Sequence, residues 1–221
     1  MRIIFGNKYY YLKGGAERHL FDLQHILEEN GHAVIPFAMA DERNRKTDWN
    51  KYFVSPVQTE KVRFSLGGLK TAGRMIYSCE AKRKFRKLIK KAKPDLVHIH
   101  NIYHQLSPSF LPVAKKHGVP VVMTAHDYKL VSPNYSMYHD GEICEHAKGD
   151  VWKAYTHRCV KGSAMASWLV ALEMSLHKRW GLYEKNIDRI LLSAEFCDHF
   201  GLNLRLKTRL YLRFTRLCLS A

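Results

Sequence analysis

The chain has 221 residues, 46% of them hydrophobic and 25% charged, a balance that excludes general disorder and a length that suits one α/β domain better than two. Its net charge of +16 comes mostly from two segments, residues 82–93 and 201–221, which carry thirteen cationic residues and no acidic one. No nucleic-acid-binding motif accompanies them, no signal peptide or membrane-spanning stretch is evident, and the cysteine count is odd, so we expect a cytoplasmic protein with reduced thiols that binds no nucleic acid.

Predicted helices and strands alternate along the chain. In order, we expect a strand over residues 2–6, a helix over 16–29, a strand over 32–39, an irregular connection over 41–68, a basic helix ending at Lys93, a strand over 96–100, a helix over 108–116, a strand over 119–124, a long segment over 125–162, a helix over 163–180 and a strand over 188–193. This alternation is typical of a Rossmann-like α/β fold with a doubly wound, mostly parallel sheet.

Polar and aromatic side chains follow three of the predicted strands, at the ends where ligands of such sheets bind. After the first strand come Tyr9, Tyr10, Tyr11, Gly14, Gly15, Glu17 and Arg18; after the strand over 96–100 come His100, Asn101, Tyr103 and His104; after the strand over 119–124 come His126, Asp127 and Tyr128. Core packing does not explain so many polar groups, so we predict a binding rim at this edge of the sheet.

Gly14 and Gly15 lie between a strand and the start of a helix. Glycine lets the backbone approach a ligand closely, and the free amides and dipole of a helix start favour a phosphate. The pair is also compatible with a simple tight turn, and it is not the dinucleotide fingerprint G-x-G-x-x-G.

His126 and Asp127 end an otherwise apolar strand. A carboxylate beside an imidazole can hold it in one tautomer or raise its basicity, but neighbours on an extended chain point to opposite sides, so a direct pair requires a turn. The alternative is a capping aspartate beside a structural histidine. On the strand over 96–100 we expect His98 to be buried and hydrogen-bonded and His100 to be functional.

Two cysteines and two histidines in the long segment have the count of a zinc site, namely Cys144, His146, His157 and Cys159. Their spacing, C-x-H followed by H-x-C, is not a common zinc-finger pattern. We therefore expect no metal, with two loop thiols near unrelated histidines.

The basic helix carries Phe85, Leu88 and Ile89 on one face, with cations around them. This pattern suits an anionic membrane surface, bound through side chains such as Lys84, Lys87 and Lys91. The alternative is a solvated helix that packs the three apolar residues inward.

Several stretches resemble the GT-B-fold family-4 glycosyltransferases. They are residues 11–19 (YLKGGAERH), 94–101 (PDLVHIHN) and 121–128 (VVMTAHDY), and the correspondence continues in order through residues 159–163 and the region of Ser193 and Glu195. The resemblance covers roughly residues 1–200 and rests on the order and spacing of these motifs, since none is decisive by itself.

The resemblance implies the N-terminal half of a GT-B fold and a retaining transfer of sugar from a nucleotide-sugar donor to a glycan or lipid-linked acceptor, in cell-surface polysaccharide synthesis and without a cofactor or catalytic metal. The family's glycine loop, which approaches the donor diphosphate, corresponds to Gly14 and Gly15, and its strand-end histidine to His126, with Asp127 beside it. The acceptor-binding role falls on Glu17, Arg18, His100, Asn101, Tyr103 and Tyr128. Many relatives act at the inner membrane surface, which agrees with the basic helix.

The family continues with a second Rossmann-like domain that binds the donor, and residues 201–221 do not resemble it. They alternate apolar and polar, mostly cationic, residues almost perfectly. We expect a family-4-like domain over residues 1–200, an atypical basic tail over 201–221, no donor-binding domain, and a truncated chain that is inactive alone or depends on a second chain. The alternative is a non-catalytic α/β module that binds an acceptor or a membrane.

Overall fold

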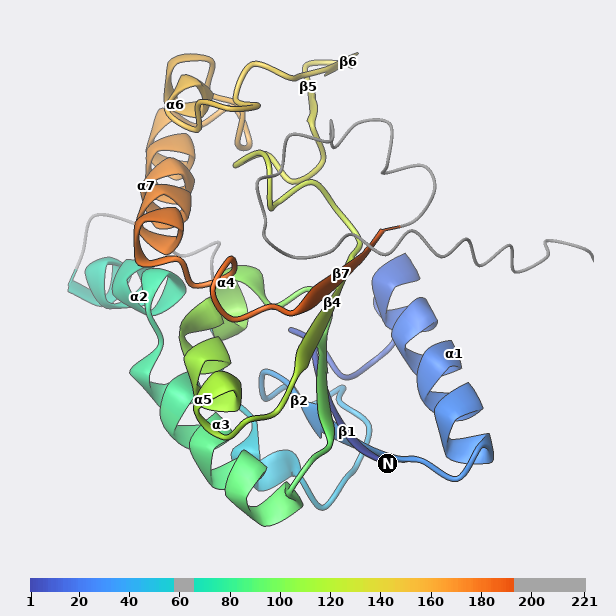
Figure 1. Cartoon of the computed structure of the whole chain (residues 1–221). Helices are drawn as coiled ribbons and strands as arrows, with labels where there is room; N and C mark the ends of the chain where they lie inside the picture. Colours follow the sequence, from blue (N-terminus) through green and yellow to red (C-terminus); the bar gives the residue numbers. More distant parts are fainter. Residues whose placement is uncertain (58–65, 193–221) are drawn as a thin grey trace, which may run out of the picture.

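The computed structural model describes residues 1–57 and 66–192, so the predicted tail over 201–221 lies outside the described residues. Five parallel strands form the central sheet in the order β2-β1-β3-β4-β7 (Figure 1). They are β1 (Arg2–Gly6), β2 (Ala33–Phe37), β3 (Leu96–Ile99), β4 (Val121–Ala125) and β7 (Arg189–Leu192). The predicted doubly wound parallel sheet is confirmed.

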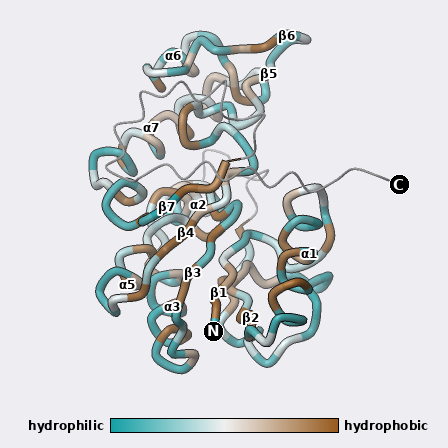
Figure 2. The backbone as a smooth tube through the Cα atoms, turned by 45° about the vertical axis from the view of Figure 1, so that its right-hand side comes forward, coloured by the Kyte–Doolittle hydropathy of each residue, from teal (hydrophilic) through white to brown (hydrophobic). Residues whose placement is uncertain are grey.

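Helices cover both faces of the sheet, α1 (Gly15–Glu29) on one side and α3 (Cys79–Ala92) with α5 (Leu111–Lys116) on the other (Figure 1). The alternation of side chains along β1 explains the two layers. Ile3 and Phe5 pack with Leu20 of α1, whereas Ile4 belongs to the larger core that includes Phe85 of α3. Figure 2 shows hydrophobic stretches gathered in the central strands, with hydrophilic turns on the outer helices.

Shorter elements fill the connections. They are η1 (Asn50–Tyr52), α2 (Leu66–Ile76), α4 (Tyr103–Leu106), η3 (Pro108–Phe110), the two-stranded hairpin β5 (Tyr138–His139) and β6 (Glu142–Ile143), α6 (Lys153–Thr156) and α7 (Ala164–Trp180). The predicted start of α7 is confirmed, because Ser163 Oγ accepts a hydrogen bond from the Ala166 amide at 3.3 Å. Among the described residues, no helix combines the length and the apolarity needed to cross a bilayer.

The predicted basic helix is two helices, since the chain breaks between α2 and α3. Ser78 caps α3, and its Oγ accepts from the Ala81 amide at 3.1 Å. Phe85, Leu88 and Ile89 are at most 2% exposed, in the core on the α3 face of the sheet. Of the two alternatives for this helix, inward packing is the one that the structure has.

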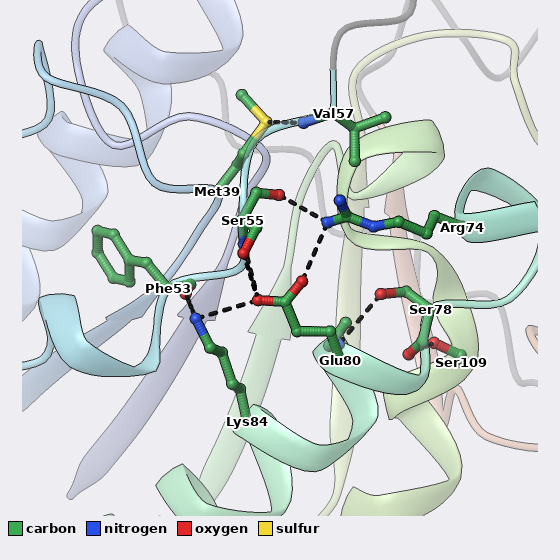
Figure 3. Close-up of polar contacts among 10 residues, drawn as sticks. Met39, Phe53, Ser55, Val57, Arg74, Ser78, Glu80, Lys84 and Ser109 are labelled. Carbon is green, nitrogen blue, oxygen red and sulfur yellow. Dashed lines mark hydrogen bonds and ion pairs between the residues drawn. The ribbon is translucent and has the colours of Figure 1, made fainter. Parts of the chain in front are cut away.

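Lys84 does not project freely from α3, which corrects its prediction as a membrane-facing side chain (Figure 3). Its ammonium lies 3.2 Å from a Glu80 oxygen and donates to the backbone carbonyl of Phe53. The Glu80 carboxylate also accepts from Arg74 at 3.1 Å and from the Ser55 hydroxyl at 2.7 Å. This cluster joins α2 and α3 to the segment after η1, so Lys84 has a structural role, whereas Lys87 and Lys91 are exposed.

Candidate functional site

The carboxyl ends of β1, β3 and β4 meet at one edge of the sheet, beside the N-terminus of α1 (Figure 1). At this edge His98 and His100 face the same side as Phe5, with ring centroids 5.3 and 5.4 Å from the Phe5 ring. Phe5 belongs to the core under α1, so both histidines lie between the sheet and that helix. The rim predicted from the strand ends is therefore centred on histidines.

Four histidines, which we call the histidine row, are in contact: His19, His98, His100 and His126. His98 Nε2 lies 2.8 Å from Thr124 Oγ1, and the His98 ring stacks on His100 at 4.5 Å between centroids. His100 Nδ1 lies 2.9 Å from His126 Nε2. The His19 ring, from α1, lies 5.2 Å from the His126 ring. The row thus joins residues from three separate elements of the fold.

Burial keeps the histidine row uncharged at neutral pH. It lowers the pKa of His98 to about 4, with further lowering by His19 and His126. It also lowers the pKa of His126 to about 4, with contributions from His19 and Lys8. The pKa of His100 is well below its ordinary value, mainly through burial, and that of His19 is lowered for the same reason. Each imidazole therefore carries one proton and one free lone pair.

Ring nitrogens of His19, His100 and His126 lie within 4.8 Å of one another, the one such group of potential metal ligands within residues 1–57 and 66–192. Neutral imidazoles are ligands of zinc, copper and nickel. Ligating histidines usually donate their second N–H to an acceptor, and His100 Nε2 is buried without one among the described residues. The Lys8 charge near His126 also opposes a cation, so the row fits a metal poorly.

Asp127 does not orient His126 in this structure, where the imidazole bonds to His100 instead. The Asp127 carboxylate accepts from the Lys129 amide at 3.0 Å, which is the capping alternative. Its pKa is raised by burial. The Tyr103 hydroxyl is buried close to it, but the geometry between them falls short of a hydrogen bond.

Gly14 and Gly15 form the start of α1, one helical turn before His19. Gly14 caps the helix in an extended conformation, and among the described residues no side chain makes a capping hydrogen bond there. A Cβ at Gly15 would meet nothing within 4 Å, and one at Gly14 only the Glu17 carboxylate at 3.8 Å. Packing against residues 1–57 and 66–192 therefore requires neither glycine, and within that part of the chain the helix start is open to an anion.

Asn7, which the sequence analysis did not single out, joins the three elements at the rim. Its side-chain amide donates to Glu17 Oε1 at 3.1 Å and to the Tyr9 carbonyl at 2.8 Å, and its Oδ1 accepts from the Asn101 amide at 3.1 Å. Glu17 and Asn101 are themselves 4% and 7% exposed. A polar residue directly after a buried strand was the signal that could have identified Asn7.

The six residues predicted to bind an acceptor separate into two groups. Glu17, Asn101, His100 and Tyr103 are buried, so in this conformation they support the rim from beneath and do not line its surface. Arg18 is exposed on α1 and Tyr128 is half-buried after β4. Of the six, these two are the ones that a bound molecule can reach, beside the half-buried His126.

A buried ion pair supports the rim from the side of α7. Lys129 and Glu173 are 4% and 1% exposed and lie 3.1 Å apart, and Glu173 also bonds His104 Nδ1 at 3.0 Å. Burial alone raises the Glu173 pKa, but the nearby His104 and Lys129 outweigh it and hold the pKa well below its ordinary value. A lone carboxylate within the apolar stretch of α7 was the only signal of this pair in the sequence.

In the long segment, the two cysteines lie next to each other and the two histidines lie next to each other. Cys144 Sγ and Cys159 Sγ lie 3.5 Å apart and are buried, and the exposed rings of His146 and His157 stack at 4.0 Å. Burial and then Cys144 raise the pKa of the Cys159 thiol to about 11. The four side chains do not converge on one point as a metal site requires.

Comparisons with known proteins identify the family. The sequence model of glycosyltransferase family 4 matches residues 13–171. A relative from Klebsiella pneumoniae, described as an "uncharacterized 42.6 kDa protein in cps region", is 30% identical over 152 residues, which cover 64% of this chain and 40% of the relative.

Two solved structures are also similar. MurG of Acinetobacter baumannii is 16% identical with a TM-score of 0.37, over 57% of this chain and 35% of MurG. A UGT transferase from Siraitia grosvenorii, solved in complex with UDP, is 13% identical with a TM-score of 0.39, over 87% of this chain and 41% of the transferase. The matched part of this chain thus spans less than half of each of these proteins. Because the family model matches well over half of the 221 residues, the chain belongs to glycosyltransferase family 4.

Proposed function

We propose that this chain is the acceptor-side domain of a retaining glycosyltransferase, which transfers a sugar from a nucleotide-sugar donor to a glycan or lipid-linked acceptor in cell-surface polysaccharide synthesis. Membership of family 4 supports the transferase, and the relative in a cps region supports polysaccharide synthesis. The observation that carries the proposal is the position of His126, half-buried at the carboxyl end of β4 and in contact with the helix that begins at Gly14 and Gly15.

The uncharged state of His126 suits this chemistry. Retaining transfer passes through an oxocarbenium-like transition state, in which positive charge develops on the sugar ring. An imidazolium beside that charge would repel it, whereas a neutral imidazole can still hydrogen-bond to an oxygen of the sugar or the phosphate. A His126 pKa of about 4 keeps the ring neutral at any pH near neutrality.

The donor diphosphate is assigned to the open start of α1, at Gly14 and Gly15. The free amides and the dipole of a helix start favour an anion. In the family a second domain binds the nucleotide, so we propose that the donor half comes from outside the described residues or from a second chain. The acceptor is assigned to the side of Arg18 and Tyr128.

A transfer assay with UDP- and GDP-sugars, with and without a candidate second chain, tests this function. We expect turnover only when the donor half is present, and a loss of at least about 100-fold in His126→Ala, since the variant lacks a contact to the reacting sugar. His25→Ala is the control, because His25 is exposed on α1 and pairs with Glu29. Absence of turnover in every combination would favour a non-catalytic binding module.

A further inference from the structure

The contact between His100 and His126 constrains where their protons lie. His100 Nδ1 and His126 Nε2 are 2.9 Å apart, a hydrogen-bond distance. Two ring nitrogens form such a bond only if one carries hydrogen and the other offers a lone pair. Because both rings are neutral, two arrangements are possible: His100 donates to His126, or His126 donates to His100.

The second nitrogen of His100 distinguishes the two arrangements. His100 is 0% exposed, and its Nε2 has no hydrogen-bond partner among the described residues. If His126 donated, the single proton of His100 would lie on Nε2 as a buried N–H without an acceptor. If His100 donates from Nδ1, Nε2 is only a bare lone pair. Orphaned buried N–H groups are rarer in proteins than acceptors with unused lone pairs, so the arrangement in which His100 donates to His126 is favoured.

The state of His126 follows. Its Nε2 accepts from His100, so its own proton must lie on Nδ1. His126 is half-buried, and Nδ1 is therefore the ring nitrogen left for a bound molecule. We propose that His100 is a positioning residue that holds His126 as the Nδ1–H tautomer, so that His126 presents a hydrogen-bond donor, and not a base, to an oxygen of the bound sugar or diphosphate.

The proposal gives His100 a role in place of the direct acceptor contact expected from the sequence. The nature of the bound oxygen rests on the proposed function, whereas the tautomer does not. A metal held by His19, His100 and His126 would require a different tautomer of His100. Ligation through His100 Nδ1 and His126 Nε2 needs both lone pairs, which moves the His100 proton to the orphaned Nε2. The tautomer of His100 therefore separates the two possibilities.

Heteronuclear NMR of isotope-labelled imidazoles in the whole chain at neutral pH reads both tautomers directly. Signals are assigned with His100→Gln and His126→Gln, and exposed His25 serves as the reference. We expect His100 and His126 both to be Nδ1–H, with spectra that EDTA does not change. An Nε2–H signal for either residue, or a change on EDTA treatment, overturns the proposal.

Two variants test whether His100 determines the tautomer of His126. In His100→Leu the donor is lost, and we expect the His126 signal to leave the pure Nδ1–H position. In His100→Asn the side-chain amide lies near the position of Nδ1 and can donate in its place, and Nδ1–H of His126 is expected to remain. If His126 keeps its wild-type tautomer in a folded His100→Leu, the positioning role is contradicted. If that variant does not fold, the wild-type spectrum still shows whether both residues have the expected tautomers.

These readouts need no turnover, so they fail independently of the proposed function. The expected tautomers in a chain that never transfers sugar would leave the positioning role in place and remove the transferase. The opposite tautomers in an active enzyme would remove the positioning role and leave the transferase in place.

Discussion

His98 shows how burial of a single side chain sets the charge of the site. It is 6% exposed, it bonds Thr124 at 2.8 Å, and its pKa is about 4 against an ordinary value of 6.5. Protonation would place a charge beside His100 and His126, within a face of the sheet that holds Phe5. Burial therefore favours the neutral imidazole at His98, His100 and His126, which also keeps His126 suited to the proposed transfer.

This burial predicts a loss of stability in mild acid. A folded-state pKa below the unfolded one means that the contribution of His98 is complete above pH 6.5 and is lost as the pH falls toward 4. The full loss is about 3 kcal/mol of unfolding free energy. In urea unfolding, the free energy of unfolding of His98→Gln should fall less steeply across this range than that of the wild type. The control His25→Gln should fall as steeply as the wild type. Equal slopes for His98→Gln and the wild type would contradict the prediction.

At the scale of the element, the residues that cap the two ends of α7 set where the helix begins and ends. Ser163 caps the start, and Gly181 ends the helix with a left-handed φ of +63°. A Cβ at Gly181 would approach the Lys185 side chain to 2.7 Å. The helix between these ends places Glu173 against Lys129 and His104, so its termini fix the register of the buried ion pair beside the rim.

Gly181→Ala is expected to destabilise the chain by about 1–2 kcal/mol, because an L side chain pays a steric cost in the left-handed region. Gly73→Ala is the matched control. Gly73 lies inside α2, where a Cβ meets nothing within 4 Å, and the substitution should stabilise by up to about 1 kcal/mol through helix propensity. Chemical denaturation measures both variants, and a neutral Gly181→Ala would show that the turn relaxes freely.

For the whole molecule, the exposed cations of α3 can still contact an anionic surface, whereas its apolar face is packed in the core. Phe85, Leu88 and Ile89 lie in the core, so the helix cannot insert them into a bilayer. Lys87 and Lys91 still point outward and can approach an anionic surface. Peripheral attachment to a membrane is therefore a proposal about charge alone.

We expect the chain to bind anionic vesicles weakly, with affinity that falls as salt rises. Lys87→Glu combined with Lys91→Glu should weaken binding at least about 10-fold, since each basic residue near such a surface contributes about 1 kcal/mol. Lys84 is left unchanged, because a glutamate there would face Glu80. Lys153→Glu with Lys161→Glu makes the same charge change near α6, far from α3 in Figure 1. Equal loss in both pairs would point to net charge and not to α3.

The order of helices and strands was predictable because it is written in local patterns. The apolar strand over residues 2–6, the periodic helix that Gly31 ends and the serine cap at Ser163 each depend on a few neighbouring residues, and each lies where it was expected. The parallel sheet followed from their alternation, and the rim followed from the rule that ligands bind at the carboxyl ends of strands.

The assignment of roles within the rim was decided by the tertiary structure. His100 and His126 are 26 residues apart and Lys129 and Glu173 are 44 apart, and such pairings depend on strand register and helix position, which no local pattern encodes. The same holds for Lys84, whose partner Glu80 is bound by groups from two other segments. The sequence by itself determined that polar side chains gather at one edge of a parallel sheet. Only the packing of distant segments determined which of them are buried and which are exposed at the rim, because burial depends on contacts that form when the chain folds.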